Sequence, residues 1–191
     1  MASPSLAEEL SQAGEAYRDK RYGVAYGIYR KLAEQGHAES QMFVGWMHLS
    51  GLGVVSEEAE AAQWFERAAA LGSTQGQFYY ARYLTKIGRH SEALPFYRRS
   101  AESGHLPSIF WVGYASARGQ GVSLNINDGY RFLLRAAKKG HVHALREVAV
   151  LDLKGCRGLT WQLVAPVEFF IAVVNAFVLA HLCRESDLLR A

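Results

Sequence analysis

The side chains best suited to metal chemistry are histidines that recur at regular positions along the chain. His141 and His143 lie two residues apart, and Cys156 follows in a predicted turn; imidazole nitrogens and thiolates are the usual ligands of zinc. Residues two apart on a helix point in different directions, and His37 and His105 occupy the same repeat position as His141. We therefore predict a structural role for these histidines at helix junctions, and no metal site.

Acidic and glycine-rich segments could indicate catalysis or nucleotide binding. Glu57, Glu58 and Glu60 could supply a general acid and base, but the positive end of a helix dipole also favours negative charge in a first turn. Gly51-x-Gly53 and Gly119-x-Gly121 resemble part of a dinucleotide-binding loop. Because they follow predicted helices and not strands, we interpret them as turns. The pattern holds no nucleophile motif or phosphate loop, so we expect a protein that is not an enzyme and needs no cofactor.

The composition is that of a folded, helix-rich chain of 191 residues. It is 50% hydrophobic and 20% charged, with four prolines and two cysteines. These values exclude a disordered chain and a disulfide framework. The N-terminal segment has neither the basic start nor the apolar stretch of a secretory signal, so we expect a cytoplasmic protein.

Basic residues are concentrated between residues 98 and 157, although the net charge of the whole chain is only +3. Such a concentration raises the question of nucleic-acid binding. Most of these side chains fall on the second helix of each predicted pair, which forms the outer face, and no nucleic-acid-binding module accompanies them. We therefore expect no nucleic-acid partner. The residues concerned are Arg98, Arg99, Arg131, Arg135, Lys138 and Lys139.

An internal repeat of 32 to 36 residues organises the chain. Such self-similarity indicates a repeat architecture. The repeat glycines are Gly36, Gly72, Gly104 and Gly140. An Ala-Ala or Ser-Ala pair precedes three of them, and an aromatic residue lies four positions before each pair, at Trp64, Phe96 and Phe132.

Each repeat is predicted to form two helices. In the second repeat the first helix should run from about Glu39 to Leu49, with Gly45 allowing close packing, and the Gly51–Val54 turn should end it. Ser56 is a candidate N-cap for the second helix. An apolar stripe follows at three- and four-residue steps, and Gly72 ends the helix. The stripe comprises Ala61, Trp64, Phe65, Ala68 and Ala69.

These residues make the chain resemble Sel1-like repeat proteins, which are related to tetratricopeptide repeat proteins. Residues 36–71 and 104–139 match the Sel1-like pattern most fully, while 6–35 and 72–103 are closer to the tetratricopeptide form. The last unit, 140–158, begins normally and then departs from the pattern. The resemblance implies an all-α fold, a right-handed superhelical solenoid of antiparallel helix pairs over residues 6–158 after a tail at 1–5. It also implies an adaptor that binds a peptide, a protein or a glycan.

In the related tetratricopeptide architecture the first helices line a concave groove. The equivalent packing positions in these helices are Gly45, Ala81, Gly113 and Ala149. Residues one after and three before each should face inward. Aromatic and arginine side chains there are typical binding anchors, although an aromatic stripe is also typical of a core. The candidates are Met42, Trp46, Phe78, Arg82, Phe110, Tyr114, Arg146 and Val150, and Arg118 and Lys154 near helix ends could hold an acidic group.

The C-terminal part of the chain is strongly apolar. We predict a helix over residues 159–183, followed by a tail at 184–191, and residues 163–182 are long enough to span a hydrocarbon core. A helix that caps the last repeat is the alternative, and Glu168 and Asn175 count against a lipid-facing span. The side chains expected to face lipid are Val167, Phe169, Phe170, Ile171, Val173, Val174, Phe177 and Val178.

Together these features predict a non-catalytic scaffold that binds a protein partner in its groove. The basic block beside the apolar segment favours a tether to the cytoplasmic face of a membrane, where the scaffold would join a membrane-associated complex. The alternative is a soluble interaction module whose apolar helix caps the solenoid or forms an oligomer interface. A regulatory subunit or enzyme on a repeat scaffold is a third hypothesis.

Overall fold

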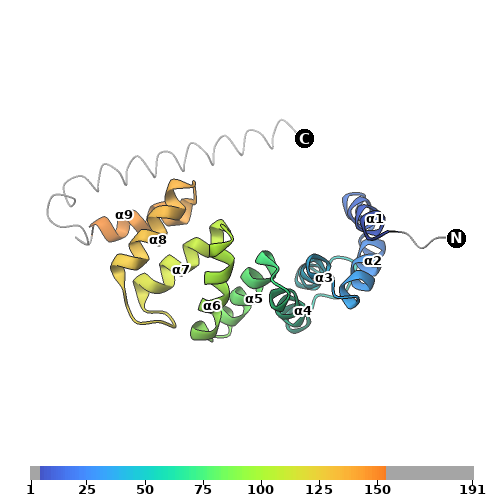
Figure 1. Ribbon diagram of the computed structural model, residues 1–191, viewed down its shortest axis with the longest axis horizontal. Coiled ribbons are helices and arrows are strands. Elements are labelled where there is room, and N and C mark those ends of the chain that lie inside the picture. Colours follow the sequence, from blue (N-terminus) through green and yellow to red (C-terminus); the bar gives the residue numbers. More distant parts are fainter. Residues whose placement is uncertain (1–4, 154–191) are drawn as a thin grey trace. The chain divides into compact units, whose positions relative to one another are not determined.

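The computed structural model describes residues 5–153, which form nine α-helices (Figure 1). The chain divides into two compact units, Met1–Ser103 and Gly104–Ala191. The helices of the first unit are α1 (Leu6–Arg18), α2 (Tyr22–Glu34), α3 (Ala38–Ser50), α4 (Glu58–Ala70), α5 (Thr74–Lys86) and α6 (His90–Glu102). Those of the second are α7 (Leu106–Arg118), α8 (Ile126–Lys138) and α9 (Val142–Leu153).

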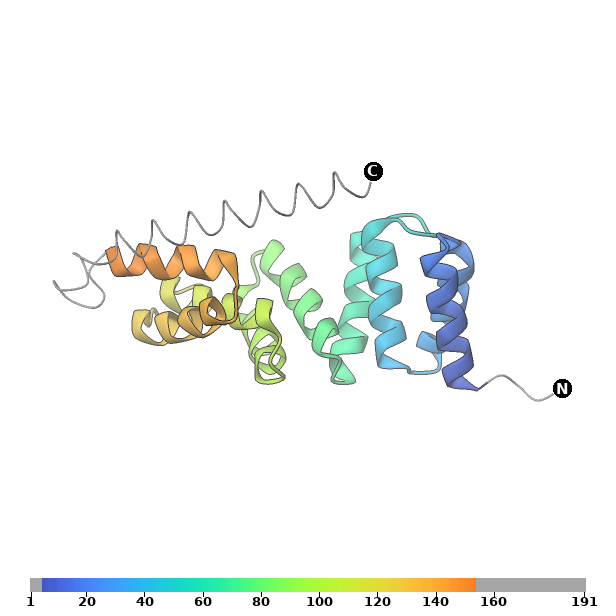
Figure 2. The same cartoon turned by 90° about the horizontal axis from the view of Figure 1, so that it is seen from above.

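Within each unit, every helix packs against the next one in the chain (Figure 2). The first helices of successive pairs also touch, because α3 contacts α5 in the first unit and α7 contacts α9 in the second. Packing limited to neighbouring repeats is the arrangement of an α-solenoid. The prediction of an all-α fold built from helix pairs is confirmed, and the predicted helix over 39–49 is found one residue longer at each end.

The apolar stripe predicted on the second helix lies in the core of the first unit. Trp64 and Phe65 are 5% and 2% exposed, and Val44 and Met47 of α3 are fully buried beside them. In the second unit Val112 of α7 and Leu133 of α8 take the places of Val44 and Phe65, and both are buried. Each pair therefore buries an apolar seam between its two helices.

Two glycines explain how closely the elements of the second repeat approach. A Cβ atom on Gly45 would lie 2.8 Å from the ring of Phe65, so only glycine lets α3 pack this closely on α4. Gly53 adopts the left-handed φ of 74°, and a Cβ there would lie 2.4 Å from the carbonyl oxygen of Tyr22. The interpretation of the Gly-x-Gly segment as turn chemistry is consistent with this geometry.

The residue after each repeat glycine caps the following first helix. Nδ1 of His37 accepts a hydrogen bond from the backbone N–H of Ser40 at 3.2 Å, and Nδ1 of His141 accepts one from the N–H of Ala144 at 3.2 Å. His105 holds the same N-cap position at α7, where its Nδ1 lies 2.9 Å from the hydroxyl oxygen of Ser108 and makes no capping bond to the backbone. The bonds of His37 and His141 satisfy N–H groups that a helix leaves unpaired at its start. The structural role predicted for the histidines is confirmed.

The cap predicted at Ser56 is wrong. Glu57 is the N-cap residue of α4 and makes no side-chain capping bond. The hydroxyl of Ser56 instead donates to the carbonyl oxygen of Leu49, at 3.4 Å. The turn therefore closes onto the end of the preceding helix, and the acidic first turn of α4, with Glu58 and Glu60, provides the electrostatic stabilisation at its start.

The apolar C-terminal segment lies outside the described residues. This applies to the predicted helix at 159–183, to its expected lipid-facing side chains and to Lys154. Among the helices between Leu6 and Leu153, none has the length and apolar character that a membrane span requires.

Candidate functional site

The predicted groove residues of the first unit differ in how far they are buried. Met42 is only 3% exposed, so it belongs to the core, and its prediction as a groove contact is corrected. Trp46 is half-buried and packs edge-on against Tyr17 of α1, with ring centroids 5.8 Å apart. On α5, Phe78 is half-buried, and the exposed guanidinium of Arg82 lies 5.9 Å from its ring centroid. That distance is at the limit of a cation–π contact.

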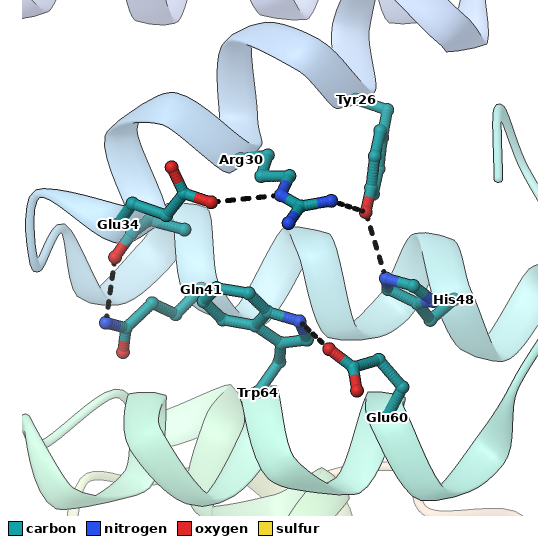
Figure 3. Close-up of polar contacts among 8 residues, drawn as sticks. Tyr26, Arg30, Glu34, Gln41, His48, Glu60 and Trp64 are labelled. Atoms are coloured by element: carbon teal, nitrogen blue, oxygen red, sulfur yellow. Dashed lines mark hydrogen bonds and ion pairs between the residues drawn. The ribbon is translucent and has the colours of Figure 1, made fainter.

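A polar network between α2 and α3 was not predicted from the sequence. His48, buried in the last turn of α3, faces Tyr26 of α2, with 3.1 Å between Nε2 and the hydroxyl oxygen (Figure 3). Arg30 donates to the same hydroxyl at 3.4 Å and to Glu34 at 3.0 Å. The network ties two neighbouring repeats together through side chains.

Two further bonds in the same region hold buried groups in place. The side-chain amide of Gln41 donates to the backbone carbonyl of Ala33 at 3.0 Å. The indole N–H of Trp64 donates to Glu60 at 3.0 Å (Figure 3), and the guanidinium of Arg67 lies 4.7 Å from the centroid of the indole. Buried polar groups need such partners, so these contacts are structural.

In the second unit, aromatic and charged side chains gather on adjacent α7 and α9. We call this surface the α7–α9 face, and its members are Phe110, Trp111, Tyr114, Arg118, His141, His143, Arg146 and Glu147. The rings of Phe110, Trp111 and Tyr114 lie 5.5 to 5.7 Å from one another. His141 stacks on Phe110 with centroids 4.6 Å apart. The three aromatic residues of α7 are half-buried, so part of each remains open to solvent.

The charged part of this face centres on Glu147 of α9. Arg118 of α7 donates to one carboxylate oxygen at 2.8 Å, and Arg146 donates to the other at 3.0 Å. Glu147 is 5% exposed, whereas the side chains of Arg118 and Arg146 are 45% and 67% exposed. The guanidinium of Arg118 also lies 4.6 Å from the ring centroid of Tyr114.

The surroundings of Glu147 keep it ionised. Burial opposes its charge, but the hydrogen bonds from Arg118 and Arg146 outweigh burial and lower its pKa below the ordinary value. The hydrogen bond to Glu147 in turn raises the pKa of Arg118. The three groups carry two positive charges and one negative charge, so the face keeps an excess of positive charge.

A small pocket of about 80 Å³ lies beside this ion-pair cluster. Its polar lining comes from Arg118 and Glu147. The remaining lining residues are Tyr114, Ala117, Leu133, Val150 and Leu151. The pocket therefore combines mostly apolar walls with charged groups.

The structure brings together most of the groove residues predicted in the second unit. Phe110, Tyr114, Arg118 and Arg146 all belong to the α7–α9 face, and Val150 lines the pocket beside it. Sequence reasoning missed Trp111 and Glu147, which lie 36 residues apart at one repeat position. Comparing that position along the repeats would have shown Phe43, Tyr79 and Trp111 followed by a carboxylate.

The described residues contain no group of three His, Cys, Asp or Glu side chains placed to hold a metal ion. His141 and His143 have ring centroids 6.0 Å apart, and His141 is occupied by its capping bond and by Phe110.

Comparisons with known proteins agree on the repeat. A family model described as the Sel1 repeat matches residues 6–37, 38–73 and 106–141. The crystal structure of a Sel1 repeat protein from Oxalobacter formigenes is 26% identical in sequence, with a TM-score of 0.68 over 84% of this chain and 73% of that one.

Two further similarities are more distant. An exopolysaccharide production negative regulator from Rhizobium meliloti (strain 1021) is 23% identical over 171 residues, which are 78% of this chain and 64% of the regulator. The chain thus spans just under two thirds of that relative's length. The immunity protein Pa5087 from Pseudomonas aeruginosa is 20% identical with a TM-score of 0.50, over 74% of this chain and 59% of that one, and shows a similar fold alone.

Proposed function

Because the chain belongs to the Sel1 repeat family, we propose that it is a protein–protein interaction module that binds a protein partner with the exposed sides of its first helices. The observation that carries the proposal is the pairing of half-buried aromatic rings with exposed arginines on these helices. Phe78 with Arg82 in the first unit and Tyr114 with Arg118 in the second are the examples. Aromatic and arginine side chains are over-represented among residues that dominate binding energy.

The proposal describes a module that acts by binding. The alternative predicted from the sequence, an interaction module without a membrane tether, fits the findings better than the tethered form, because the family match and the similar crystal structure support the repeat module. The rhizobial relative is named a negative regulator, and a regulator can act by binding another protein.

Site-specific photocrosslinking tests this function. The photoreactive amino acid p-benzoylphenylalanine would replace Phe78 or Tyr114 in the full chain, produced in cells of its natural host. Matched control positions are Gln63 and Arg131, which are exposed on second helices. We expect discrete protein adducts from the first-helix positions and none of the same size from the controls. Adducts of equal yield from all four positions, or no adduct from Phe78 and Tyr114, would contradict the proposal.

A further inference from the structure

The arrangement of Arg118, Arg146 and Glu147 leaves binding capacity on the α7–α9 face. A guanidinium has five N–H donors in a planar fork, and each arginine gives one hydrogen bond to Glu147. Both arginine side chains are exposed to solvent. Because both arginines are hydrogen-bonded to the buried carboxylate of Glu147, their guanidinium groups are held in position before a partner binds.

The charge of this cluster favours a negatively charged group. Two arginines against one carboxylate leave an excess of one positive charge, and no acidic residue other than Glu147 is within ion-pair distance of either arginine in the described part of the chain. Arginine forks match the geometry of a carboxylate and can bind both of its oxygens. Among the side-chain groups of a protein partner, a carboxylate therefore fits this surface best.

The adjoining pocket adds a size limit. A water molecule occupies about 30 Å³ in the liquid, and a cavity that accepts benzene measures about 150 Å³. A pocket of about 80 Å³ lined by Leu133, Val150 and Leu151 is smaller than that cavity and fits a small aliphatic side chain. Because Arg118 lines this pocket and also belongs to the arginine pair, the site for an aliphatic side chain adjoins the site for a carboxylate.

We propose that the α7–α9 face binds an extended peptide segment of a partner protein in which a small aliphatic residue stands next to an aspartate or glutamate. This inference rests on the proposed function and names the chemistry that the second unit recognises. The aliphatic side chain fills the pocket, the carboxylate binds Arg118 and Arg146, and the rings of Phe110 and Trp111 contact the rest of the segment. A free inorganic anion would leave the apolar pocket empty.

Binding of short peptides to the full-length protein tests the inference. The probes are heptapeptides with Gly and Ser flanks around a central Val-Asp or Asp-Val pair, and matched peptides in which Asn replaces Asp or Gly replaces Val. The readout is the shift of the arginine Nε–H signals in nuclear magnetic resonance spectra during titration. We expect at least one acidic aliphatic peptide to shift the Arg118 signal, and each matched change to weaken binding about tenfold, since a charge-assisted hydrogen bond or a filled apolar pocket contributes that much.

Three variants distinguish specific binding at the α7–α9 face from nonspecific electrostatic attraction to the protein. Arg118→Gln removes one arm of the pair, and Val150→Phe fills the pocket without changing charge. Arg131→Gln removes an arginine from the outer face, where its side chain is 82% exposed. We expect about tenfold weaker binding for each of the first two, and unchanged binding for Arg131→Gln. Circular dichroism identifies any variant that fails to fold, and Arg118→Gln, which changes a half-exposed side chain, remains informative if Val150→Phe does not fold.

Specific outcomes would overturn the inference. One is equal binding of the Asp and Asn peptides, and another is an equal loss in Arg118→Gln and Arg131→Gln. Absence of any shift at millimolar peptide is a third. A photocrosslink from position 114 to residues 154–191 of the same chain is a fourth, because the chain would then occupy its own pocket. Each of these leaves adducts from position 78 unaffected, so failure here is distinguishable from failure of the proposed function.

Discussion

Arg118 at the end of α7 donates a hydrogen bond of 2.8 Å to Glu147 in the middle of α9, and so joins two successive first helices of the second unit. The carboxylate stands at the repeat position that holds Phe43, Tyr79 and Trp111 in the preceding first helices. The last described repeat therefore replaces an aromatic contact with a buried charge. Such a charge is tolerated because two arginines surround it.

Removing this charge should destabilise the second unit. Glu147→Gln keeps the shape of the side chain but weakens both arginine bonds, so we expect the free energy of unfolding to fall by about 1–2 kcal/mol. Urea unfolding followed by circular dichroism measures it. Asp128→Asn is the control, because the exposed pair of Asp128 and Arg131 is 3.6 Å long and should contribute less than about 0.5 kcal/mol.

The same variant has a defined pH dependence. The folded-state pKa of Glu147 is lowered, so its stabilisation is complete above the unfolded-state value of about 4.3 and is lost as the pH falls through the lower folded-state value. The stability difference between wild type and Glu147→Gln should therefore be constant from pH 7 to 5 and shrink below pH 4. A difference that persists unchanged at pH 3 would mean that packing, and not charge, accounts for it.

The helix pairs could be predicted from the sequence because their signals repeat. The alanine pair, the aromatic residue and the glycine that end each unit occur several times, so one irregular copy does not obscure the pattern. Individual contacts were harder to predict. Met42 was placed in the groove by counting back from Gly45, yet it is buried, while the adjacent Phe43 is half-buried and stacks on Tyr29 at 4.8 Å. Helix spacing gives the direction of a side chain around the helix axis, but packing against neighbouring helices decides how deeply it is buried.

The candidate site was predictable to a similar degree. Phe110, Tyr114 and Arg146 were expected from their spacing and Arg118 from its place near a helix end, and the four side chains do gather on one face. The role of Glu147 could not be read from its surroundings in the sequence, because its partner Arg118 lies 29 residues away and only the contact of α7 with α9 brings them together.

The histidines at the N-cap positions should make stability depend on pH near neutrality. Burial lowers the pKa of His105, whose Nδ1 lies 2.9 Å from the Ser108 hydroxyl. Burial, and then the nearby His143, lowers the pKa of His141. A lowered folded-state pKa means that stabilisation is present above the unfolded-state value of about 6.5 and is lost as the pH falls through the folded-state value.

Replacing both histidines by asparagine tests this prediction, since asparagine caps a helix without titrating. We expect the unfolding free energy of the wild type to decrease between pH 7 and pH 5, and that of the His105→Asn, His141→Asn double variant to decrease less. Thermal unfolding at several pH values measures both. Identical pH profiles would show that protonation of these caps does not affect folding.

Adding one methyl group at two glycines should have opposite effects. Gly45→Ala places a Cβ 2.8 Å from the ring of Phe65, and overpacking of this kind costs about 1–3 kcal/mol. Gly27 lies within α2 and a Cβ there would meet nothing within 4 Å, so Gly27→Ala should stabilise the protein by about 0.5–1 kcal/mol through the higher helix propensity of alanine. Chemical denaturation of both variants gives the two values. A stabilising Gly45→Ala would mean that the approach of α3 to α4 is looser than the structure indicates.

Stability measurements also separate contact residues from core residues among the predicted groove side chains of the first unit. Trp46 packs against Tyr17 and the core cluster around Val44 and Met47. Trp46→Ala should therefore cost about 2 kcal/mol of unfolding free energy, less than the 3–5 kcal/mol of a fully buried tryptophan. Arg82 is exposed, and its guanidinium lies 5.9 Å from the ring centroid of Phe78, so Arg82→Ala should change stability by less than about 0.5 kcal/mol. We expect Arg82→Ala to reduce crosslinking from position 78, because Arg82 contacts the partner. Trp46→Ala should lower stability and leave crosslinking unchanged, because Trp46 supports the fold. The reverse result would place the partner beside α3.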